Sequence, residues 1–380
     1  MVMLPDFNRE VHCLLGLPFD AVNMSDAVRH IRASASNRSP CFLSTPNLNF
    51  LIAAQSDIAF RNSVINSDLS IADGMPLVWI ARLLGMPIRE RVAGSGLFDT
   101  LRDDSRKPLS VFFFGGPDGA AEAACRRLNL ERRGLTCAGF ESPGFGSVED
   151  MSNHAIIQRI NASNADFLVV SLGAKKGQAW IERNRLQIKV PVISHLGAVV
   201  NFVAGTVKRA PAWMQNTGLE WLWRIKEDPA LWRRYAFDGL GFLRLVITRV
   251  VPYAWFVFWH KPKRHELDSA ATELFVEGCE TIISLRGAWV LNNMKPLREC
   301  FSSLALTDRD VRIELEHVTY IDSAFVGLLL LLYGDQKRRG RRFSVGQIKI
   351  NVSKVFWYSC AKFLLDPRNV MESSVTKNHT

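Results

Sequence analysis

One carboxylate in this sequence stands where a catalytic base would be useful. Asp73 lies in the segment Ser70-Ile71-Ala72-Asp73-Gly74-Met75-Pro76, where a short turn backed by glycine follows apolar residues. A carboxylate on such a turn reaches into a cleft, where it can take a proton from a substrate hydroxyl. Capping of the following helix explains Asp73 equally well from these residues alone.

Small and polar residues follow other apolar runs in the same way. Ser44-Thr45-Pro46-Asn47 combines a hydroxyl, a rigid turn and a carboxamide, which suits a nucleotide or sugar, although Thr-Pro-Asn also begins many helices. The segment from Arg89 to Gly96, and the glycines Gly115, Gly116 and Gly119, let backbone N–H groups approach phosphate oxygens. Their spacing is neither GxGxxG nor a Walker A loop, so dinucleotide and P-loop sites are disfavoured.

Metal chemistry finds little support. The eight histidines include no HExxH, and no DxD pair that would hold a metal against a diphosphate occurs in the first 230 residues. His195 follows a predicted strand, where a place in the core or cleft is as good an explanation as ligation. We therefore expect no metal site and no cofactor.

The elements that must position these residues alternate between strands and helices from about residue 10 to 205. Strands are predicted at 41–44, 111–114, 167–172 and 190–193, and helices at 117–130 and 177–186. Each strand is apolar on both faces, as a parallel strand covered by helices would be. Ligands bind at the carboxyl ends of such strands, where the small and polar residues stand. An open α/β parallel sheet is the predicted fold.

The excess positive charge is local. The 380-residue chain carries 47 Lys and Arg against 37 Asp and Glu, a formal +10, and its 48% hydrophobic content excludes a disordered protein. Between Lys208 and Arg264, 11 basic and four acidic residues give +7, among six of the ten tryptophans. An anionic membrane surface or a phosphorylated substrate fits this segment better than nucleic acid, because no nucleic-acid-binding motif accompanies it.

Residues 236–259 are predicted to form an amphipathic helix at a membrane interface, kinked at Pro252. The longest uncharged run, Val250 to Trp259, has ten residues, and a spanning helix needs about 20, so spanning is not expected. The predicted apolar face consists of Leu243, Val246, Ile247, Val250, Ala254 and Val257. A helix packed on the core with a solvated basic face is the alternative.

A small domain is predicted beyond residue 266. Its strands are expected at 273–277, 281–285, 311–315 and 343–345, and its helices at 294–304, 324–333 and 352–365. The Leu328 to Leu332 run predicts a helix buried against a sheet. The chain thus divides into an α/β core (1–207), a basic appendage (208–265) and a small α/β domain (266–380).

Cysteine usage and the N-terminus favour the cytoplasm. The seven cysteines are scattered and never spaced as CxxC, so a disulfide framework or zinc ribbon is not expected. The first 16 residues contain acids and no continuous apolar run, unlike a signal peptide.

Taken together, these segments resemble the WecG/TagA/CpsF family of bacterial glycosyltransferases. The matching pieces are Thr45-Pro46-Asn47, Ala72-Asp73-Gly74, Glu90-Arg91-Val92-Ala93-Gly94-Ser95, Phe114-Gly115-Gly116, Ser171-Leu172-Gly173, Ala204 to Pro211, Gly218 to Arg224 and Trp232 to Tyr235. The resemblance implies a Rossmann-like core and transfer of a sugar from a UDP-sugar to the hydroxyl of a lipid-linked sugar, usually on undecaprenyl diphosphate, with inversion. It also implies a basic appendage that completes the site at the membrane.

The resemblance also implies residue roles. Asp73 matches the proposed base, and Thr45 and Asn47 match a substrate-contacting turn. Arg91, Gly94, Ser95, Gly115, Gly116 and Gly173 stand in the other matching pieces as substrate-binding candidates; Arg209, Arg224, Arg233 and Arg234 are candidates for the phosphates or the membrane. Three departures concern the donor sugar: relatives usually have Asp at Gly96, Gln at Gly177 and Phe-Asp at Val200-Asn201. Gln178 is the candidate to replace the missing glutamine.

The C-terminal segment resembles a STAS domain, the module shared by anti-sigma-factor antagonists and sulfate transporters. Its carriers are Leu285-Arg286-Gly287, Leu291-Asn292, Val311 to Leu315 and Tyr320-Ile321-Asp322-Ser323-Ala324-Phe325-Val326-Gly327, with Phe325 where Gly is usual. In antagonists the serine matching Ser323 is phosphorylated by a partner kinase, and the added charge remodels a docking face. A helix cap in a passive interaction module is the alternative.

The leading hypothesis is a cytoplasmic inverting glycosyltransferase of cell-surface or extracellular polysaccharide synthesis, peripheral on the inner face of the plasma membrane. Its expected partners are a UDP-sugar, a polyprenyl-diphosphate-linked acceptor, an anionic membrane and a protein or kinase at the STAS domain, and not nucleic acid. A degenerate transferase acting as a sugar-nucleotide sensor or scaffold is the second hypothesis. A nucleotide-dependent oxidoreductase is disfavoured by the absent GxGxxG.

Overall fold

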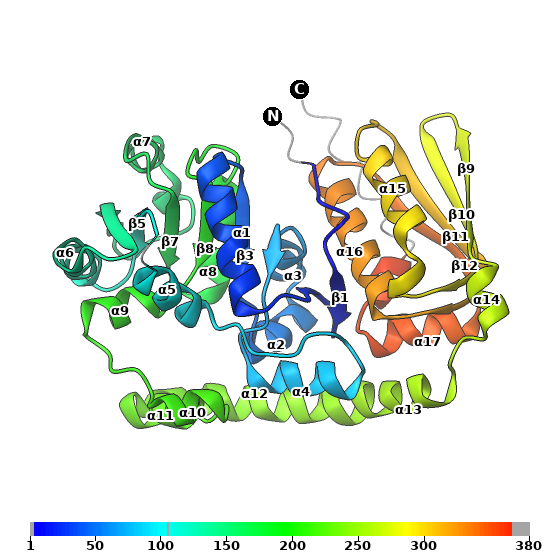
Figure 1. The fold of residues 1–380 in the computed structure, drawn as a ribbon, viewed down its shortest axis with the longest axis horizontal. Helices are drawn as coiled ribbons and strands as arrows, with labels where there is room; N and C mark the ends of the chain where they lie inside the picture. Colours follow the sequence, from blue (N-terminus) through cyan, green and yellow to red (C-terminus); the bar gives the residue numbers. More distant parts are fainter. Residues whose placement is uncertain (1–3, 105, 367–380) are drawn as a thin grey trace.

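The computed structural model describes residues 4–104 and 106–366, without the side chains of Ala212 and Asn216. The outer limits of the predicted domains, at 1–3 and 367–380, lie outside these residues. An α/β core and a smaller α/β domain stand side by side, and a long helix runs beneath both (Figure 1).

The core is built on a six-stranded parallel sheet, which confirms the predicted fold class. The strand order is β4 (Leu69–Ser70), β3 (Cys41–Ser44), β8 (Val192–His195), β7 (Phe167–Ser171), β5 (Leu109–Gly115) and β6 (Leu135–Glu141). β8 begins two residues later than predicted. The sequence did not predict β4, which has only two residues, or β6, a partly exposed edge strand with little apolar signal.

Both faces of the sheet are buried, as apolar strands require. Val111 and Phe113 point to the side covered by α1 (Met24–Asn37), α5 (Gly94–Asp103), α6 (Ala120–Glu131) and α9 (Val199–Ala204). Phe112 and Phe114 point to the side of α7 (His154–Ala162) and α8 (Ala174–Asn184). A third apolar cluster joins the hairpin β1 (Val11–Leu14) and β2 (Leu17–Asp20) to α2 (Leu48–Ser56), α3 (Ile58–Ile65) and α4 (Met75–Leu83).

The basic appendage forms two short helices and one long one. After α10 (Ala212–Asn216) and α11 (Glu220–Glu227) come the 3-10 turn η2 (Pro229–Leu231), α12 (Trp232–Leu245), the π-helical segment η3 (Val246–Val250) and α13 (Val251–Trp259). These last four elements make one continuous helix, Pro229–Trp259, which by length and composition alone is long and apolar enough to cross a membrane. It begins seven residues before the predicted helix 236–259, and the expectation that it does not span a membrane stays a prediction.

Pro252 does not end or break this helix. The departure from α-helical geometry lies just before it, in η3, and Pro252 stands in the first turn of α13. Proline lacks an N–H and its ring crowds the carbonyl four residues back, so a wider π turn accommodates it.

The apolar face predicted for the membrane interface is divided between the protein interior and solvent. Val250 is buried, together with Tyr253 and Phe256, whereas Leu243 and Ile247 are exposed. Apolar residues lie almost all round this helix, so periodicity did not indicate which of them face the core.

The small domain has the predicted strands and helices in a mixed sheet. The order is β12 (Phe343–Ile348), β11 (Asp310–Ile321), β10 (Glu280–Trp289) and β9 (Ala271–Glu277); β9 is antiparallel to β10, and the other pairs are parallel. The helices are α14 (Arg264–Asp268), α15 (Lys295–Leu304), α16 (Ser323–Arg338) and α17 (Ile350–Tyr358), with 3-10 turns η4 (Leu291–Asn293) and η5 (Lys362–Leu365).

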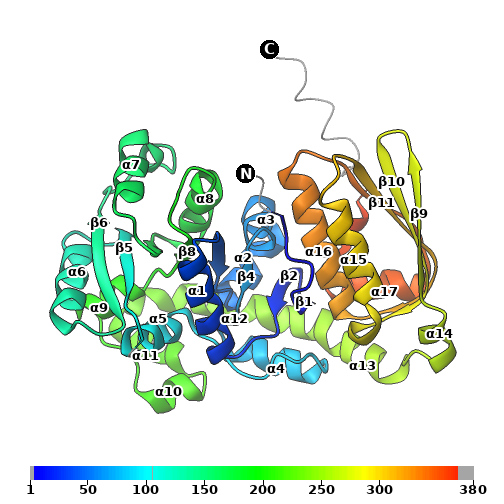
Figure 2. The ribbon, with the colours of Figure 1, turned by 45° about the horizontal axis from the view of Figure 1, so that its top comes forward.

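The helix α16 lies between this sheet and the core. Its leucine run is buried as predicted, and on its other side it packs along β1 (Figures 1 and 2). The close approach needs Gly327, because a Cβ there would lie 2.4 Å from the carbonyl oxygen of Val11. The small domain is therefore seated on the core rather than tethered to it.

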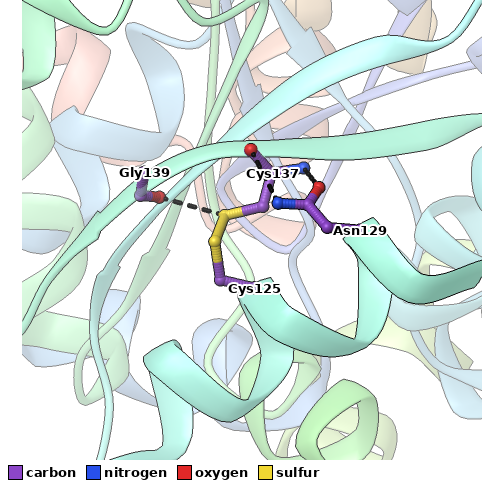
Figure 3. Close-up of a disulfide and its surroundings, with 4 residues drawn as sticks. All are labelled: Cys125, Asn129, Cys137 and Gly139. Carbon is purple, nitrogen blue, oxygen red and sulfur yellow. Dashed lines mark hydrogen bonds between the residues drawn. A yellow bond between two sulfur atoms is a disulfide. The ribbon is translucent and has the colours of Figure 1, made fainter. Parts of the chain in front are cut away.

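One disulfide was not predicted. It joins Cys125 of α6 to Cys137 of β6 (Figure 3), and the Asn129 side chain hydrogen-bonds the backbone of Cys137. The two cysteines are 12 residues apart, a spacing unlike CxxC, and the turn from α6 into β6 brings them together. The other five cysteines are free.

Candidate active site

Backbone pairing places Asp73 beside the Thr-Pro-Asn turn. The chain after β4 continues along the chain after β3, so that Ile71 N–H donates to the Ser44 carbonyl at 3.0 Å and Asp73 N–H to the Pro46 carbonyl at 2.9 Å. Asn47 caps α2 through its side chain, which accepts from Phe50 N–H at 3.3 Å. The two sequence-predicted segments therefore form one edge of a single site.

A third segment packs on the other side of Asp73. The Asp73 carboxylate accepts from the Arg91 guanidinium at 3.1 Å and from the backbone N–H of Gly94, the first residue of α5, at 3.2 Å. Asp73 thus binds the N-terminus of α5, not that of the helix that follows it. A side chain at Gly94 has no room, because a Cβ would lie 2.6 Å from Leu196 and 3.0 Å from Thr45.

Arg91 also binds the appendage. Its Nη2 lies 2.8 Å from Oε2 of Glu220 on α11, and its Nη1 donates to the carbonyl oxygen of Gln215 at 3.1 Å. Arg224, one turn after Glu220, lies 3.5 Å from the same carboxylate. One guanidinium therefore joins the candidate base to the helices that follow the core.

The electrostatics of this group favour a proton acceptor at Asp73. Burial raises the pKa of Asp73, although Arg91 and the Gly94 N–H oppose the rise. Burial also disfavours ionised Glu220, but the charge and hydrogen bond of Arg91 leave the pKa of Glu220 lowered. A carboxylate with a raised pKa accepts a proton more readily than an unperturbed one, which is what a general base requires.

These residues line a cavity of about 320 Å³. The core contributes Asn47, Leu48, Asn49, Asp73, Gly74, Met75, Pro76, Arg91 and Ser95, and the appendage contributes Gly218, Glu220, Trp221, Arg224, Arg234, Tyr235, Asp238 and Gly239. Arginines, carboxylates and aromatic rings therefore face one space between the core and the appendage.

The cavity brings together six of the predicted site residues: Asn47, Asp73, Arg91, Ser95, Arg224 and Arg234. Thr45 is buried behind them against Gly94. Arg209 lies at the edge, paired with Asp99 and 3.2 Å from Ser95 Oγ. Arg233 is exposed and lies over Trp232, away from the cavity.

The predicted glycines lie further along the sheet edge. Gly115 and Gly116 have positive φ angles, and a Cβ on Gly115 would lie 2.9 Å from the carbonyl oxygen of Ser171, so they allow β5 and β7 to end close together. Gly173 precedes α8 and borders open space. None of the three lines the described cavity.

Gln178 faces the core. Its side chain is fully buried and donates to Ser44 Oγ at 3.2 Å, so it does not reach the cavity. Steric crowding explains why residue 177 is a glycine, because a Cβ there would lie 2.3 Å from Cδ2 of His195. Burial lowers the pKa of His195, whose Nε2 lies 2.6 Å from the Leu172 carbonyl oxygen. The neutral imidazole thus occupies the space that a side chain at 177 would need.

Sequence reasoning missed several residues of the cavity wall. Glu220 lies inside the stretch that matched the family, and its acidic charge in a basic segment was a usable signal. Tyr235 ends the matching piece that begins at Trp232. Asn49 and Asp238 carried no signal, since only the docking of α12 on α2 brings them together.

Residues 4–104 and 106–366 hold no group of three or more His, Cys, Asp or Glu arranged to bind a metal ion. The expectation of a metal-free site stays a prediction. In the cavity, positive charge comes from arginines.

The site combines a parallel α/β sheet, a carboxylate on a turn at its carboxyl edge and an arginine-rich appendage, an arrangement that suits a phosphorylated ligand. Comparison with known proteins gives the family: residues 12–254 match the glycosyl transferase WecG/TagA/CpsF family, and the chain belongs to it. Residues 276–358 match the MlaB-type STAS domain. The chain is therefore a glycosyltransferase with a STAS domain.

Curated relatives support this assignment. The chain is 28% identical over 220 residues to an N-acetylglucosaminyldiphosphoundecaprenol N-acetyl-beta-D-mannosaminyltransferase of Bacillus spizizenii, covering 57% of this chain and 84% of that one. Proteins of the same name are 27% identical in Bacillus subtilis (50% and 73% covered) and 26% identical in Staphylococcus aureus (58% and 85%).

Proposed function

We propose that this protein transfers a sugar from a UDP-sugar to a hydroxyl of a sugar linked to a polyprenyl diphosphate, with inversion at the anomeric carbon. The observation that carries the proposal is the cavity itself, which Asp73 lines together with Arg224 and Arg234 of the appendage. The names of the relatives, which act on a lipid-linked diphosphate sugar, support an acceptor of that class.

The residues present suit the reaction. The acceptor oxygen attacks C1 of the donor sugar and gives its proton to Asp73, while the bond from C1 to the diphosphate oxygen breaks and UDP leaves. Negative charge grows on the departing diphosphate, and guanidinium groups stabilise it best when they are already in place. Arg224 and Arg234 supply those groups without a metal ion.

The test is UDP release with a panel of UDP-sugars, UDP-N-acetylmannosamine among them, and a short-chain polyprenyl diphosphate sugar as acceptor. The variant Asp73→Asn keeps a hydrogen-bond acceptor for Arg91 and removes the base, so kcat is expected to fall about 10²- to 10⁴-fold. Asp103→Asn, at an exposed surface pair with Arg133, is the matched control. A folded Asp73→Asn protein with wild-type activity would remove Asp73 as the base.

The same panel decides the sensor hypothesis. A degenerate transferase would bind UDP-sugars without releasing UDP under any combination of donor and acceptor. The position of Asp73 against Arg91 and the cavity favours turnover, and transfer above the Asp73→Asn background would end the sensor hypothesis.

For the STAS domain we propose a role in cis, docked on the catalytic core. Ser323 is only 8% exposed, and its Oγ lies 2.9 Å from Nδ1 of His12 on β1. Arg298 of α15 donates to the carbonyl oxygens of Phe7 and Arg9. A kinase reaches Ser323 only if the two domains separate, so phosphorylation at this residue would report or drive undocking.

Limited proteolysis tests the docking. Ser323→Asp places a carboxylate in the buried contact, and we expect cleavage between residues 259 and 271 to accelerate at least tenfold as the domain separates. Ser303→Asp, on the exposed side of α15, is the control. Equal cleavage rates in the two variants would contradict docking through α16.

We propose peripheral binding of the appendage to an anionic membrane. One side of the long helix exposes Leu240, Leu243, Ile247, Val251, Trp255 and Phe258, and α4 adds Trp79 and Leu83. Exposed apolar residues gathered on one face indicate an interaction surface. The opposite side of the helix packs on the core through Val250 and on the STAS domain through Tyr253, so crossing the bilayer would require the helix to detach.

Sedimentation with anionic vesicles tests the membrane proposal. The double variant Trp255→Glu and Phe258→Glu is expected to stay in the supernatant at a lipid concentration that sediments the wild type. Phe145→Glu, at an exposed phenylalanine of a distant loop, is the control. Identical sedimentation of all three proteins would refute binding through this face.

A further inference from the structure

Besides Asp73 and Glu220, a third carboxylate lines the cavity and has no role in the mechanism above. Asp238 lies on α12 where this helix crosses α2, and it is only 3% exposed. The Nδ2 of Asn49, in the first turn of α2, lies 3.1 Å and 3.3 Å from its two oxygens. Both residues border the cavity that also contains Asp73.

This pairing leaves the carboxylate incompletely satisfied. Two ionised oxygens accept about four hydrogen bonds, and one neutral amide group supplies only two hydrogens. Within the described part of the chain, no other hydrogen bond to Asp238 and no ion pair with it is formed; burial raises its pKa, and Asn49 and the charge of Arg234 oppose the rise. Burial of a charge at such a place costs free energy unless further donors arrive. The open side of the cavity is where those donors can come from.

The surroundings indicate what kind of ligand brings them. Arg234 lines the same cavity four residues earlier, about one helical turn or ~5.4 Å away along α12. Trp221 and Tyr235, whose rings lie 6.2 Å apart, border the same space. A cation, a hydrogen-bond acceptor and aromatic faces at this spacing match the phosphate, hydroxyls and ring of a sugar diphosphate.

We propose that Asp238, held in place by Asn49, is a specificity-determining residue that accepts hydrogen bonds from the hydroxyls of a sugar whose diphosphate is bound by Arg234. The proposal rests on the proposed function and extends it to sugar recognition. Two sources offer this chemistry, the sugar of the UDP donor and the first sugar of the lipid-linked acceptor.

The first experiment measures binding, which does not depend on turnover. Dissociation constants of UDP, a UDP-sugar and a short-chain polyprenyl diphosphate sugar are measured by calorimetry for the wild type, for Asp238→Asn and for the exposed control Glu227→Gln. Asp238→Asn keeps an acceptor for Asn49 and loses the charge. We expect weaker binding of one sugar ligand by about 10- to 100-fold, the range of a hydrogen bond to a charged group, with UDP binding unchanged.

The ligand whose binding weakens shows whether Asp238 contacts the donor sugar or the acceptor sugar. In active enzyme the same variant should raise the KM of that substrate by a similar factor and leave kcat within about threefold, because Asp238 does not take the proton. A deoxy analogue that lacks the contacted hydroxyl should bind wild type and variant equally.

Two outcomes overturn the proposal: unchanged affinity for both sugar ligands in folded Asp238→Asn, or an equal loss for UDP and UDP-sugar, which would indicate a merely structural residue. If Asp238→Asn weakens the binding of one sugar ligand as expected but the wild type releases no UDP under any condition, the transferase activity is refuted. The assignment of Asp238 to sugar binding is then still supported.

Discussion

Acid should loosen the contact between the catalytic core and the STAS domain through His12. This imidazole is 3% exposed between β1 and α16, where its Nδ1 contacts Ser323 Oγ. Burial lowers the pKa of His12 to about 4, with the charge of Arg298 acting in the same direction and Asp20 opposing it. The Glu10 carboxylate lies 3.8 Å from Nε2 and is half exposed. The folded protein therefore favours the neutral imidazole.

The size of the effect follows from the difference between folded and unfolded states. The unfolded chain titrates His12 near its usual pKa of about 6.5, so protonation favours unfolding, and stability is lost as pH falls from about 6.5 toward 4. With a folded-state pKa of about 4, the loss is about 1 kcal/mol at pH 6, about 2 kcal/mol at pH 5 and about 3 kcal/mol at pH 4.

Urea unfolding at pH 8, 6, 5 and 4 tests this value against the variant His12→Asn. Asparagine keeps a polar group near the position of Nδ1, within reach of Ser323, and does not ionise. From pH 8 to pH 4, the unfolding free energy of the wild type should fall by about 3 kcal/mol more than that of His12→Asn. Groups that titrate alike in both proteins cancel from this difference. His154→Asn, at an exposed histidine of α7, controls for the substitution. Parallel pH profiles for the wild type and His12→Asn would refute the reasoning.

Three further predictions concern the core. Arg91→Met leaves two partly buried carboxylates without their shared cation and should cost about 3 kcal/mol or more of unfolding free energy, measured in urea, together with most activity. Gly177→Gln should lower stability by about 1–3 kcal/mol through collision with His195, and thermal unfolding in a His195→Ala background should show a smaller loss. Alkylation of the denatured, unreduced protein should modify five cysteines, and reduction should expose Cys125 and Cys137 to give seven.

The sequence predicted the elements whose physics is local. Apolar runs such as 111–114 and 167–172 belong to strands buried on both faces, and that environment dictates their composition. The leucine run of α16 was predicted for the same reason. The sequence did not predict which apolar residues of the long helix are buried, because burial depends on the surfaces that the helix packs against. Tyr253, for example, is buried where its ring stacks on that of Tyr358 of the STAS domain, with the ring centroids 5.9 Å apart.

In the candidate site, too, the residues that the sequence predicted differ from those it missed in how local their positioning is. Asp73 and Asn47 were predicted from the residue types of their turns and from the family resemblance, and the structure adds that the adjacent strands β4 and β3 bring the two turns together. Glu220 and Asp238, which bind Arg91 and Asn49, stand well over 100 residues after these partners, and only the docking of the appendage defines those contacts. Gly177 was identified as a departure from the family, but only the structure shows that the His195 ring fills the space a side chain there would need.

A single helix connects the three functional surfaces. Its first part, α12, places Arg234 and Asp238 in the cavity and turns Leu240 and Leu243 outward. Its last part, α13, packs Phe256 into the apolar cluster of the STAS domain. Because Arg234 and Phe256 belong to one continuous helix, the same element positions the cavity wall and the contact with the STAS domain.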